Sequence, residues 1–178
     1  MPQIQSRLDP HSEAFARNRA AMLTAIEQVR QLEQNLLNKA AEAKAKFDKR
    51  GQLLPRERLN LLLDPGAPFL ELASLAGYKM HDDKDGSAAG GGLIAGIGYV
   101  SGIRAMVVAN NSAIKGGTIS PSGLKKSLRL QQIAQENKLP VITLAESGGA
   151  NLNYAAEIFV EGARSFANQA RMSAMGLP

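Results

Sequence analysis

The sequence is poor in the residue types that most often carry chemistry. Its 178 residues include no cysteine, no tryptophan and only two histidines, and aromatic residues make up 4%. The lack of cysteine excludes disulfides, thiol catalysis and cysteine-bound zinc, and it fits a reducing cytoplasm. The scarcity of aromatic rings leaves few surfaces on which bases could stack, which argues against a nucleic-acid partner.

Long apolar runs are also lacking. No stretch approaches the roughly 20 apolar residues of a membrane-spanning helix, and the first ten residues, MPQIQSRLDP, lack the apolar core of a secretory signal. A membrane partner is therefore not expected. The apolar content is nonetheless 44%, which predicts a globular protein. The net charge of +5 is concentrated in residues 1–60, which carry 11 Lys and Arg against 7 Asp and Glu.

The first third of the chain reads as helical. Residues 11–48 contain no glycine or proline, place apolar residues near a 3.6-residue period, and start at a plausible cap, Ser12. This helix either packs on its own domain or forms an arm that contacts another subunit, and spacing alone does not separate the two. A short helix is expected to start at Pro55 and to end at the turn signal of residues 64–66.

The remaining elements alternate between strands and helices. Strands are predicted at residues 68–77 and, as a hairpin turning at Ser101-Gly102, within residues 93–111. A helix is expected from Pro121, capped by Ser120, and another over residues 155–175. The strand between them, residues 141–145, is apolar at nearly every position, which predicts cover on both faces.

Several catalytic motifs are excluded by their context. The glycines of residues 90–95 match a dinucleotide-binding pattern, but they precede a strand instead of following one. Ser147 lacks the flanking glycine pattern of a nucleophile elbow. His11 and His81 have no partner at metal-ligand spacing and are expected at the surface, so no metal site is predicted.

An acidic loop and a group of cations are less decisive. Asp82, Asp83 and Asp85 lack the spacing of a calcium loop, which favours a solvated loop within residues 80–92. Lys115-Gly116-Gly117 precedes the helix that starts at Pro121, and three cations share one face of that helix: Lys125, Lys126 and Arg129. This face either is simply solvated or lies beside an anion such as a phosphate.

The stretch VITLAESGGANLN, residues 141–153, combines a strand, a turn with two glycines and the start of a helix. Ligands of α/β sheets bind at the carboxyl ends of strands, and glycines allow close approach to the backbone. Backbone N–H groups at this turn could hold an oxyanion. The alternative is a tight loop that needs positive φ, and spacing does not decide between them.

From about Leu53 onward the sequence resembles the carboxyltransferase (β) subunits of biotin-dependent acyl-CoA carboxylases. The resemblance rests on five collinear segments: LPRERLNLLLDPGAPFLEL, GGGLIAGIGYVSGIRAMVVANN, KGGTISP, KKSLRLQQIAQENKLPVITLAESGGANL and FANQARMSAMGLP. The SGGAN form is similar to the branch acting on methylcrotonoyl-CoA and geranyl-CoA, and LNYAAEIFVEGARSFANQA is more similar to geranyl-CoA carboxylase.

This resemblance implies an α/β, crotonase-like fold of stacked ββα units with an N-terminal helical arm. It implies an arm at residues 1–52 and an incomplete carboxyltransferase N-domain at residues 53–178. The implied reaction moves CO2 from carboxybiotin to the γ-carbon of an unsaturated acyl-CoA, through a dienolate stabilised by backbone N–H groups. The expected substrate is geranyl-CoA; the alternatives are methylcrotonoyl-CoA, another acyl-CoA reaction on this fold, or an assembly module.

The resemblance also implies partners and site residues. Biotin would be carried by a partner α subunit that also uses ATP, and the β chains would form a hexamer. The catalytic oxyanion-hole glycines are expected beyond Pro178, so the 178 residues alone are expected to be inactive. The expected acyl-CoA-binding residues form two segments: Gly148, Gly149 and Ala150, and, as the weaker candidates, Lys115, Gly116 and Gly117.

Overall fold

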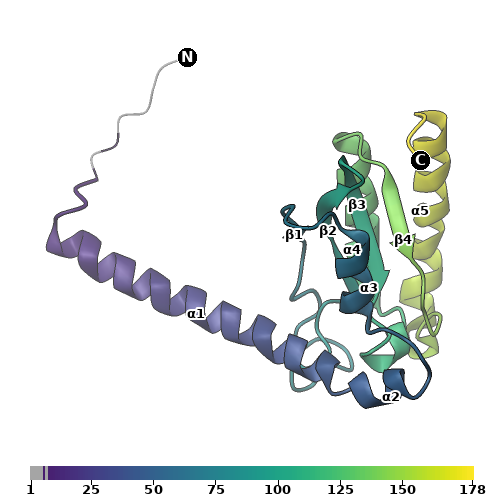
Figure 1. The fold of residues 1–178 in the computed structure, drawn as a ribbon, viewed down its shortest axis with the longest axis horizontal. Helices are drawn as coiled ribbons and strands as arrows, with labels where there is room; N and C mark the ends of the chain where they lie inside the picture. Colours follow the sequence, from purple (N-terminus) through teal and green to yellow (C-terminus); the bar gives the residue numbers. More distant parts are fainter. Residues whose placement is uncertain (1–5, 7) are drawn as a thin grey trace.

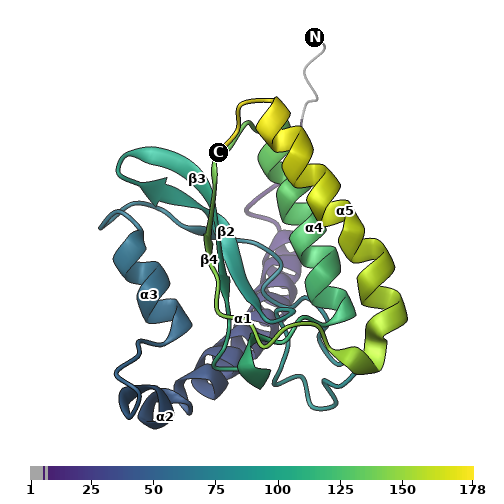
Figure 2. The same cartoon turned by 90° about the vertical axis from the view of Figure 1, so that its right-hand side faces the viewer.

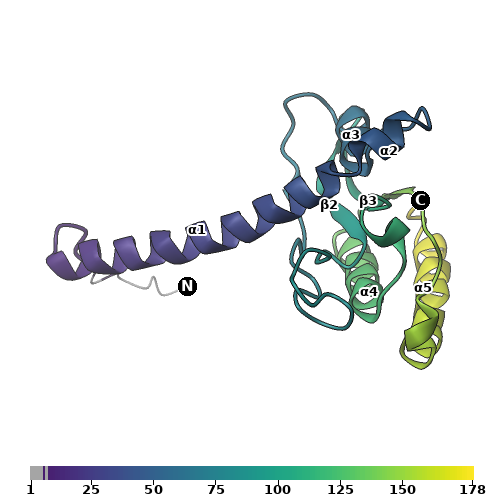
Figure 3. The ribbon, with the colours of Figure 1, turned by 90° about the horizontal axis from the view of Figure 1, so that it is seen from below.

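The computed structural model describes residue 6 and residues 8–178; residues 1–5 and 7, within the N-terminal stretch searched for a signal, lie outside it. A long helix, α1 (Glu13–Ala41), projects from the remainder of the molecule (Figures 1 and 3). The predicted cap is confirmed, because Ser12 Oγ accepts a hydrogen bond from the N–H of Phe15 at 3.2 Å. The single helix expected over residues 11–48 is interrupted, since α2 (Lys44–Asp48) is separate.

The two helices meet the body of the protein differently. No residue of α1 is buried, and a hydrogen bond from Ser74 Oγ to Glu33 Oε1, at 2.6 Å, ties its C-terminal part to the body. Phe47 of α2 is buried, with 4% of its surface exposed. The break at residues 42–43 thus occurs where the chain passes from an exposed helix to one that contributes to the core.

Four strands form one sheet in the order β1-β2-β3-β4, with β1 (Leu70–Glu71) and β4 (Val141–Leu144) at its edges. The central hairpin joins β2 (Leu93–Val100) to β3 (Ile103–Asn110) in antiparallel register, and β4 pairs with β3 in parallel. The predicted turn at Ser101-Gly102 is confirmed. Both residues have positive φ, as tight two-residue hairpin turns require.

The first predicted strand is much shorter than expected. Residues 68–77 were the predicted range, and only two residues pair with β2. Ala73 has a φ of 50°, in the left-handed region, so the extended conformation cannot continue through it.

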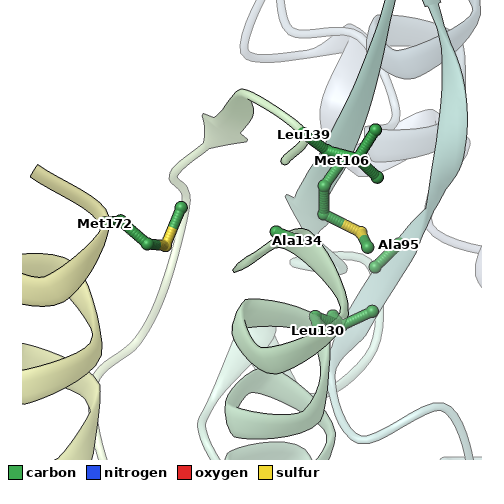
Figure 4. Close-up of a cluster of buried hydrophobic side chains, with 6 residues drawn as sticks. All are labelled: Ala95, Met106, Leu130, Ala134, Leu139 and Met172. Atoms are coloured by element: carbon green, nitrogen blue, oxygen red, sulfur yellow. The ribbon is translucent and has the colours of Figure 1, made fainter. Parts of the chain in front are cut away.

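The hairpin is covered on both faces. On one face α3 (Pro55–Leu62) packs on the sheet, and on the other α4 (Pro121–Glu136) packs on it with α5 (Ala155–Ala174) beside α4 (Figures 2 and 3). Alternate residues of the hairpin enter two different cores. The α3 core contains Leu59, Ile94, Ala105 and Val107. The α4–α5 core contains Ala95, Met106, Leu130, Ala134, Leu139 and Met172 (Figure 4).

The strand after α4 corrects one prediction. Residues 141–145 were expected to be covered on both faces, yet β4 is only half-buried and Thr143 is exposed. The reason is its place at the edge of the sheet, where β3 pairs with one side only. On the other side, the N–H of Val141 donates to the carbonyl oxygen of Pro178 at 2.9 Å.

Candidate functional site

The structure brings the two predicted glycine segments together. Residues 115–117 form a short 3-10 helix, η1 (Lys115–Gly117), and the turn after β4 lies against it. The N–H of Gly148 donates to the carbonyl oxygen of Gly116 at 2.9 Å, and Ser147 Oγ donates to that of Gly117 at 3.0 Å. These segments are 30 residues apart in sequence and adjacent in space.

A second set of backbone contacts extends this pairing. The N–H of Ile119 donates to the carbonyl oxygen of Gly149 at 2.8 Å, and the N–H of Asn151 donates back to Ile119 at 2.9 Å. Ile119 and Ala150 form a parallel β-bridge and pack beside a small core of Leu124, Leu128 and Ile158. The turn therefore leads through η2 (Leu152–Tyr154) into α5 in a defined position.

Two of the glycines are required for separate reasons. A Cβ on Gly117 would lie 2.6 Å from the carbonyl oxygen of Glu146, so only glycine lets the two segments approach this closely. Gly149 has a φ of 89°, which side chains rarely adopt, while the space around it is open. The alternative of a loop that needs positive φ is therefore correct for Gly149.

The hypothesis of free backbone donors at this turn needs correction. The N–H of Gly148 is used by Gly116, and the N–H of Gly149 donates to Ser147 Oγ at 3.0 Å. Both donors are satisfied within the protein, so this pair is not poised to bind an oxyanion. The turn offers a shaped backbone surface instead.

Glu146 fixes the start of the turn. Its carboxylate Oε2 accepts a hydrogen bond from Arg58 Nη1 at 2.8 Å, and its N–H donates to Asn110 Oδ1 at 3.1 Å. Asn110 is buried at the end of β3. No local pattern in the sequence indicates this contact, because Arg58 and Glu146 are 88 residues apart.

A groove of about 1040 Å³ runs between α5, α4 and the sheet, beginning beside the turn. Gly117, Ile119 and Asn110 line it near the turn, and Val141 and Met172 line it further along. Its lining is predominantly apolar and comes mainly from β2, β3, β4, α4 and α5. The α5 contribution includes Phe159, Gly162, Ala163, Phe166 and Gln169.

A second cavity, of about 230 Å³, lies on the other side of the triple-glycine turn, residues 90–92. Gly91 and Gly92 line both cavities, and Lys115, Asp82 and Asn151 line the smaller one. The loop at residues 80–92 thus separates a mainly apolar groove from a cavity with polar groups.

The loop at residues 80–92 is held by more hydrogen bonds than a solvated loop was expected to make. Asp83 is buried, and its carboxylate accepts from the N–H groups of Lys79 and Ala88 at 3.0 and 2.8 Å. Asp82 accepts from Tyr154 Oη at 2.9 Å and Asn151 Nδ2 at 3.0 Å, and these bonds lower the pKa of Asp82. The expectation of a solvated loop is therefore wrong at Asp83, whereas Asp82 is exposed as expected and is nonetheless hydrogen-bonded.

Two residues that line the smaller cavity are exposed and still contact other segments. His81 remains exposed, as expected for a surface residue, although its ring packs edge-on against Tyr154 with centroids 5.0 Å apart. Lys115 is also exposed, and its Nζ donates to the carbonyl oxygen of Asp82 at 3.0 Å. The loop, η1 and the start of α5 are joined at this point.

The predicted cationic face of α4 is divided in the structure. Lys125 and Arg129 are exposed, but Lys126 is only 5% exposed. Its Nζ donates to the carbonyl oxygens of Gly90 and Leu93 at 3.1 and 2.7 Å. Burial lowers the pKa of Lys126 to about 8. Lys126 therefore holds the triple-glycine turn and is not part of a solvated or anion-binding face.

Within residue 6 and residues 8–178, no group of three histidine, aspartate or glutamate side chains could hold a metal ion. No helix in that part of the chain combines the length and apolar character needed to cross a bilayer.

The comparisons with known proteins match this arrangement. The family model of the carboxyl transferase domain covers residues 46–178. The chain belongs to the carboxyl transferase family. A probable methylcrotonoyl-CoA carboxylase beta chain from Drosophila melanogaster is 42% identical over 98% of this chain and 31% of its own length. A probable biotin-dependent acyl-CoA carboxylase beta2 subunit from Mycobacterium tuberculosis is 43% identical over 98% and 32%.

Solved structures confirm the predicted fold. The beta subunit of P. aeruginosa geranyl-CoA carboxylase is 74% identical, with a TM-score of 0.90 over 99% of this chain and 33% of that one. The transcarboxylase 12S structure, at 22% identity, has a TM-score of 0.73 and shows the fold alone. The crotonase-like carboxyltransferase fold is thus confirmed, and the chain spans about a third of the length of these relatives.

Proposed function

We propose that this chain is a segment of the carboxyltransferase (β) subunit of a biotin-dependent acyl-CoA carboxylase that acts on geranyl-CoA. The observation that carries the choice of substrate is the 74% identity to a geranyl-CoA carboxylase beta subunit. Identity to methylcrotonoyl-CoA carboxylase beta chains is lower, at 41–42% for three of them.

The proposed reaction has two balanced halves. The biotin-carrying α subunit uses ATP and bicarbonate to form carboxybiotin. At the β subunit, the N–C bond of carboxybiotin would break, and the ureido nitrogen, which keeps the electron pair, would take up a proton from the γ-carbon of the unsaturated acyl-CoA. The electron pair of that C–H bond would spread to the thioester oxygen as a dienolate, and the released CO2 would form a C–C bond at the γ-carbon.

The groove supports an acyl group of substantial size. Its volume of about 1040 Å³ lies at the upper end of typical ligand pockets. Apolar side chains from five elements line it, and such a lining favours a branched hydrocarbon chain over a polar one. A ten-carbon geranyl group uses more of this surface than the five-carbon acyl group of methylcrotonoyl-CoA.

The two glycine segments are the proposed wall at one end of the acyl-CoA site. Gly117 lines the groove itself, and Gly148 lies on Gly116 through a hydrogen bond. Gly149 and Ala150 line neither cavity and are joined to the groove through Ile119, which lines it and pairs with both of them, while Lys115 lies on the side of the smaller cavity. No oxyanion is assigned to these residues, because the N–H groups of Gly148 and Gly149 are already used.

The proposed assembly follows from the reaction. Carboxybiotin must reach the site on a mobile carrier, so a biotin-carrying α subunit is the proposed partner, and a β hexamer is the proposed form of this subunit. The division into an arm at residues 1–52 and a domain at residues 53–178 stays a proposal, supported by the projection of α1 (Figure 1). A cytoplasmic location is proposed from the cysteine-free composition.

The test is ATP-dependent incorporation of labelled bicarbonate by the β subunit that contains this segment, together with its biotin subunit. Geranyl-CoA and methylcrotonoyl-CoA are assayed in parallel, with avidin added as the control that sequesters biotin. Avidin-sensitive labelling that is much faster with geranyl-CoA is the expected result. Labelling of neither ester would reject the carboxylase and leave another acyl-CoA reaction or an assembly role.

A second candidate substrate is methylcrotonoyl-CoA. It is favoured by the names of several relatives, among them a Mycobacterium tuberculosis beta1 subunit that is 50% identical over 76% of this chain. Labelling confined to methylcrotonoyl-CoA would select this candidate and reject geranyl-CoA.

A further inference from the structure

The turn after β4 has little apolar packing to hold it. Residues Ala145, Ser147, Gly148 and Gly149 are all exposed. The strand that precedes them lies at the edge of the sheet and is half-buried. Since exposed segments with few buried contacts open at low free-energy cost, polar contacts must determine where this turn lies.

Those polar contacts reach two different parts of the molecule. The hydrogen bonds of residues 146–149 described above join the turn to residues 110–119, which are themselves mainly loop after β3. The contact from Arg58 to Glu146 instead joins the turn to α3. A loop resting on another loop can shift with it, whereas a contact to a packed helix fixes its position.

The helix that carries Arg58 is firmly packed. Leu59, the next residue, is 1% exposed and belongs to the core between α3 and the hairpin. Pro55 at the start of α3 is among the fully buried side chains. The side chains of Arg58 and Glu146 are 32% and 29% exposed, so water screens their 2.8 Å contact only in part.

We propose that Arg58 is a positioning residue for the carboxyltransferase reaction: through Glu146 it holds the glycine turn of residues 145–150 as the wall of the acyl-CoA site. This inference rests on the proposed function of that turn. Arg58 and residues 145–150 lie outside the lining of both cavities, and the turn adjoins the groove through its hydrogen bonds to Gly117 and Ile119, which line it. Arg58 acts through Glu146, and its loss should therefore impair acyl-CoA binding more than it impairs turnover or folding.

The chain contains a matched control two residues away. Arg56 on the same helix forms a two-pronged contact with the carboxylate of Glu71, at 2.9 and 3.0 Å. Its exposure of 36% is close to that of Arg58. Arg56 contacts β1 and not the turn, so its loss removes an ion pair of at least equal strength while leaving residues 145–150 in place.

The kinetic test compares Arg58→Met with Arg56→Met in the holoenzyme. For Arg58→Met, the KM for geranyl-CoA should rise about tenfold with kcat changed less than twofold, and Arg56→Met should leave KM unchanged. The double variant Arg58→Glu/Glu146→Arg, which reverses the pair, should recover most of the KM. Equal KM effects in the two single variants, or none in either, would overturn the proposal.

A readout independent of activity keeps this test separate from the proposed function. Hydrogen exchange in a peptide covering residues 145–150 should be at least tenfold faster in Arg58→Met than in wild type, and unchanged in Arg56→Met. Unchanged exchange in Arg58→Met would overturn the proposal even if KM rises. Faster exchange in an enzyme that carboxylates neither ester would reject the proposed function, and with it the role of Arg58 in that reaction.

Discussion

Glycines of two kinds surround the candidate site. Gly91 and Gly123 are packed against each other where the loop enters β2: a Cβ on Gly91 would lie 2.7 Å from Gly123 Cα, and one on Gly123 would overlap the Gly91 carbonyl oxygen. Around Gly149 and Gly162, by contrast, no heavy atom beyond the adjoining backbone lies within 4 Å of the Cβ position. The first pair serves backbone packing, and the second leaves space that a ligand can use.

The largest effect is expected at the packed pair. Gly123→Ala adds a methyl group that meets the backbone of Gly91, which cannot yield as the end of a flexible side chain would. Overpacking of this kind should lower the free energy of unfolding by about 3 kcal/mol, although alanine is the better helix former. Thermal unfolding of the β subunit measures this effect. An unchanged or raised Tm would mean that helix propensity prevails and that the packing is not tight.

The free energy of unfolding should depend on pH through Lys126, whose Nζ donates to the carbonyl oxygens of Gly90 and Leu93 beside the packed glycines. The pKa of Lys126 is lowered to about 8 from 10.5 by burial, with Glu71 raising it and Arg56 lowering it further. Between those pH values the unfolded chain binds the extra proton, so this group adds stability as pH rises. Relative to Lys126→Met, wild type should gain about 2 kcal/mol from pH 8 to pH 10.

The comparison with Lys126→Met needs a control at an exposed site. Lys125→Met removes a neighbouring but exposed charge of the same helix. Its stability difference from wild type should change little over the same pH range. A pH trend of equal size in both variants would assign the effect to net charge and not to the burial of Lys126.

Local signals in the sequence predicted much of the fold. The helix caps Ser12 and Ser120 and the hairpin turn at residues 101–102 depend on neighbours within four residues, and all three are confirmed. The shortened β1 and the half-buried β4 depend on what lies beside each strand. Periodicity and apolar content contain no information about that neighbour.

The candidate site was predictable only in part. The two glycine segments were found as separate motifs, and their contact became visible only in the folded chain. Helical spacing assigned Lys126 to an exposed face, because no pattern in the sequence shows that the carbonyls of Gly90 and Leu93 fold over it. The pairing of Arg58 with Glu146 was missed for the same reason.

Among the open glycines, Gly162 should have the larger effect on substrate choice. It lines the groove from α5 and its Cβ position is open, so the larger side chain of Gly162→Leu would occupy part of that space. The kcat/KM for geranyl-CoA should fall about tenfold, the equivalent of one or two methylene groups in an apolar pocket. The kcat/KM for methylcrotonoyl-CoA should change less, and Gly162→Ala should affect neither. Equal losses for both esters would place the acyl chain outside this groove.

The smallest effect is expected at Gly149. Gly149→Val should lower kcat/KM for the acyl-CoA about fivefold, because a β-branched side chain would cover the backbone that the ligand approaches. Its φ of 89° adds strain for any side chain, so Gly149→Ala serves as the control that carries the strain with little bulk. A larger loss for valine than for alanine would show that access matters. Equal losses would assign the whole effect to backbone strain, and unchanged kcat/KM in both variants would remove this turn from the acyl-CoA site.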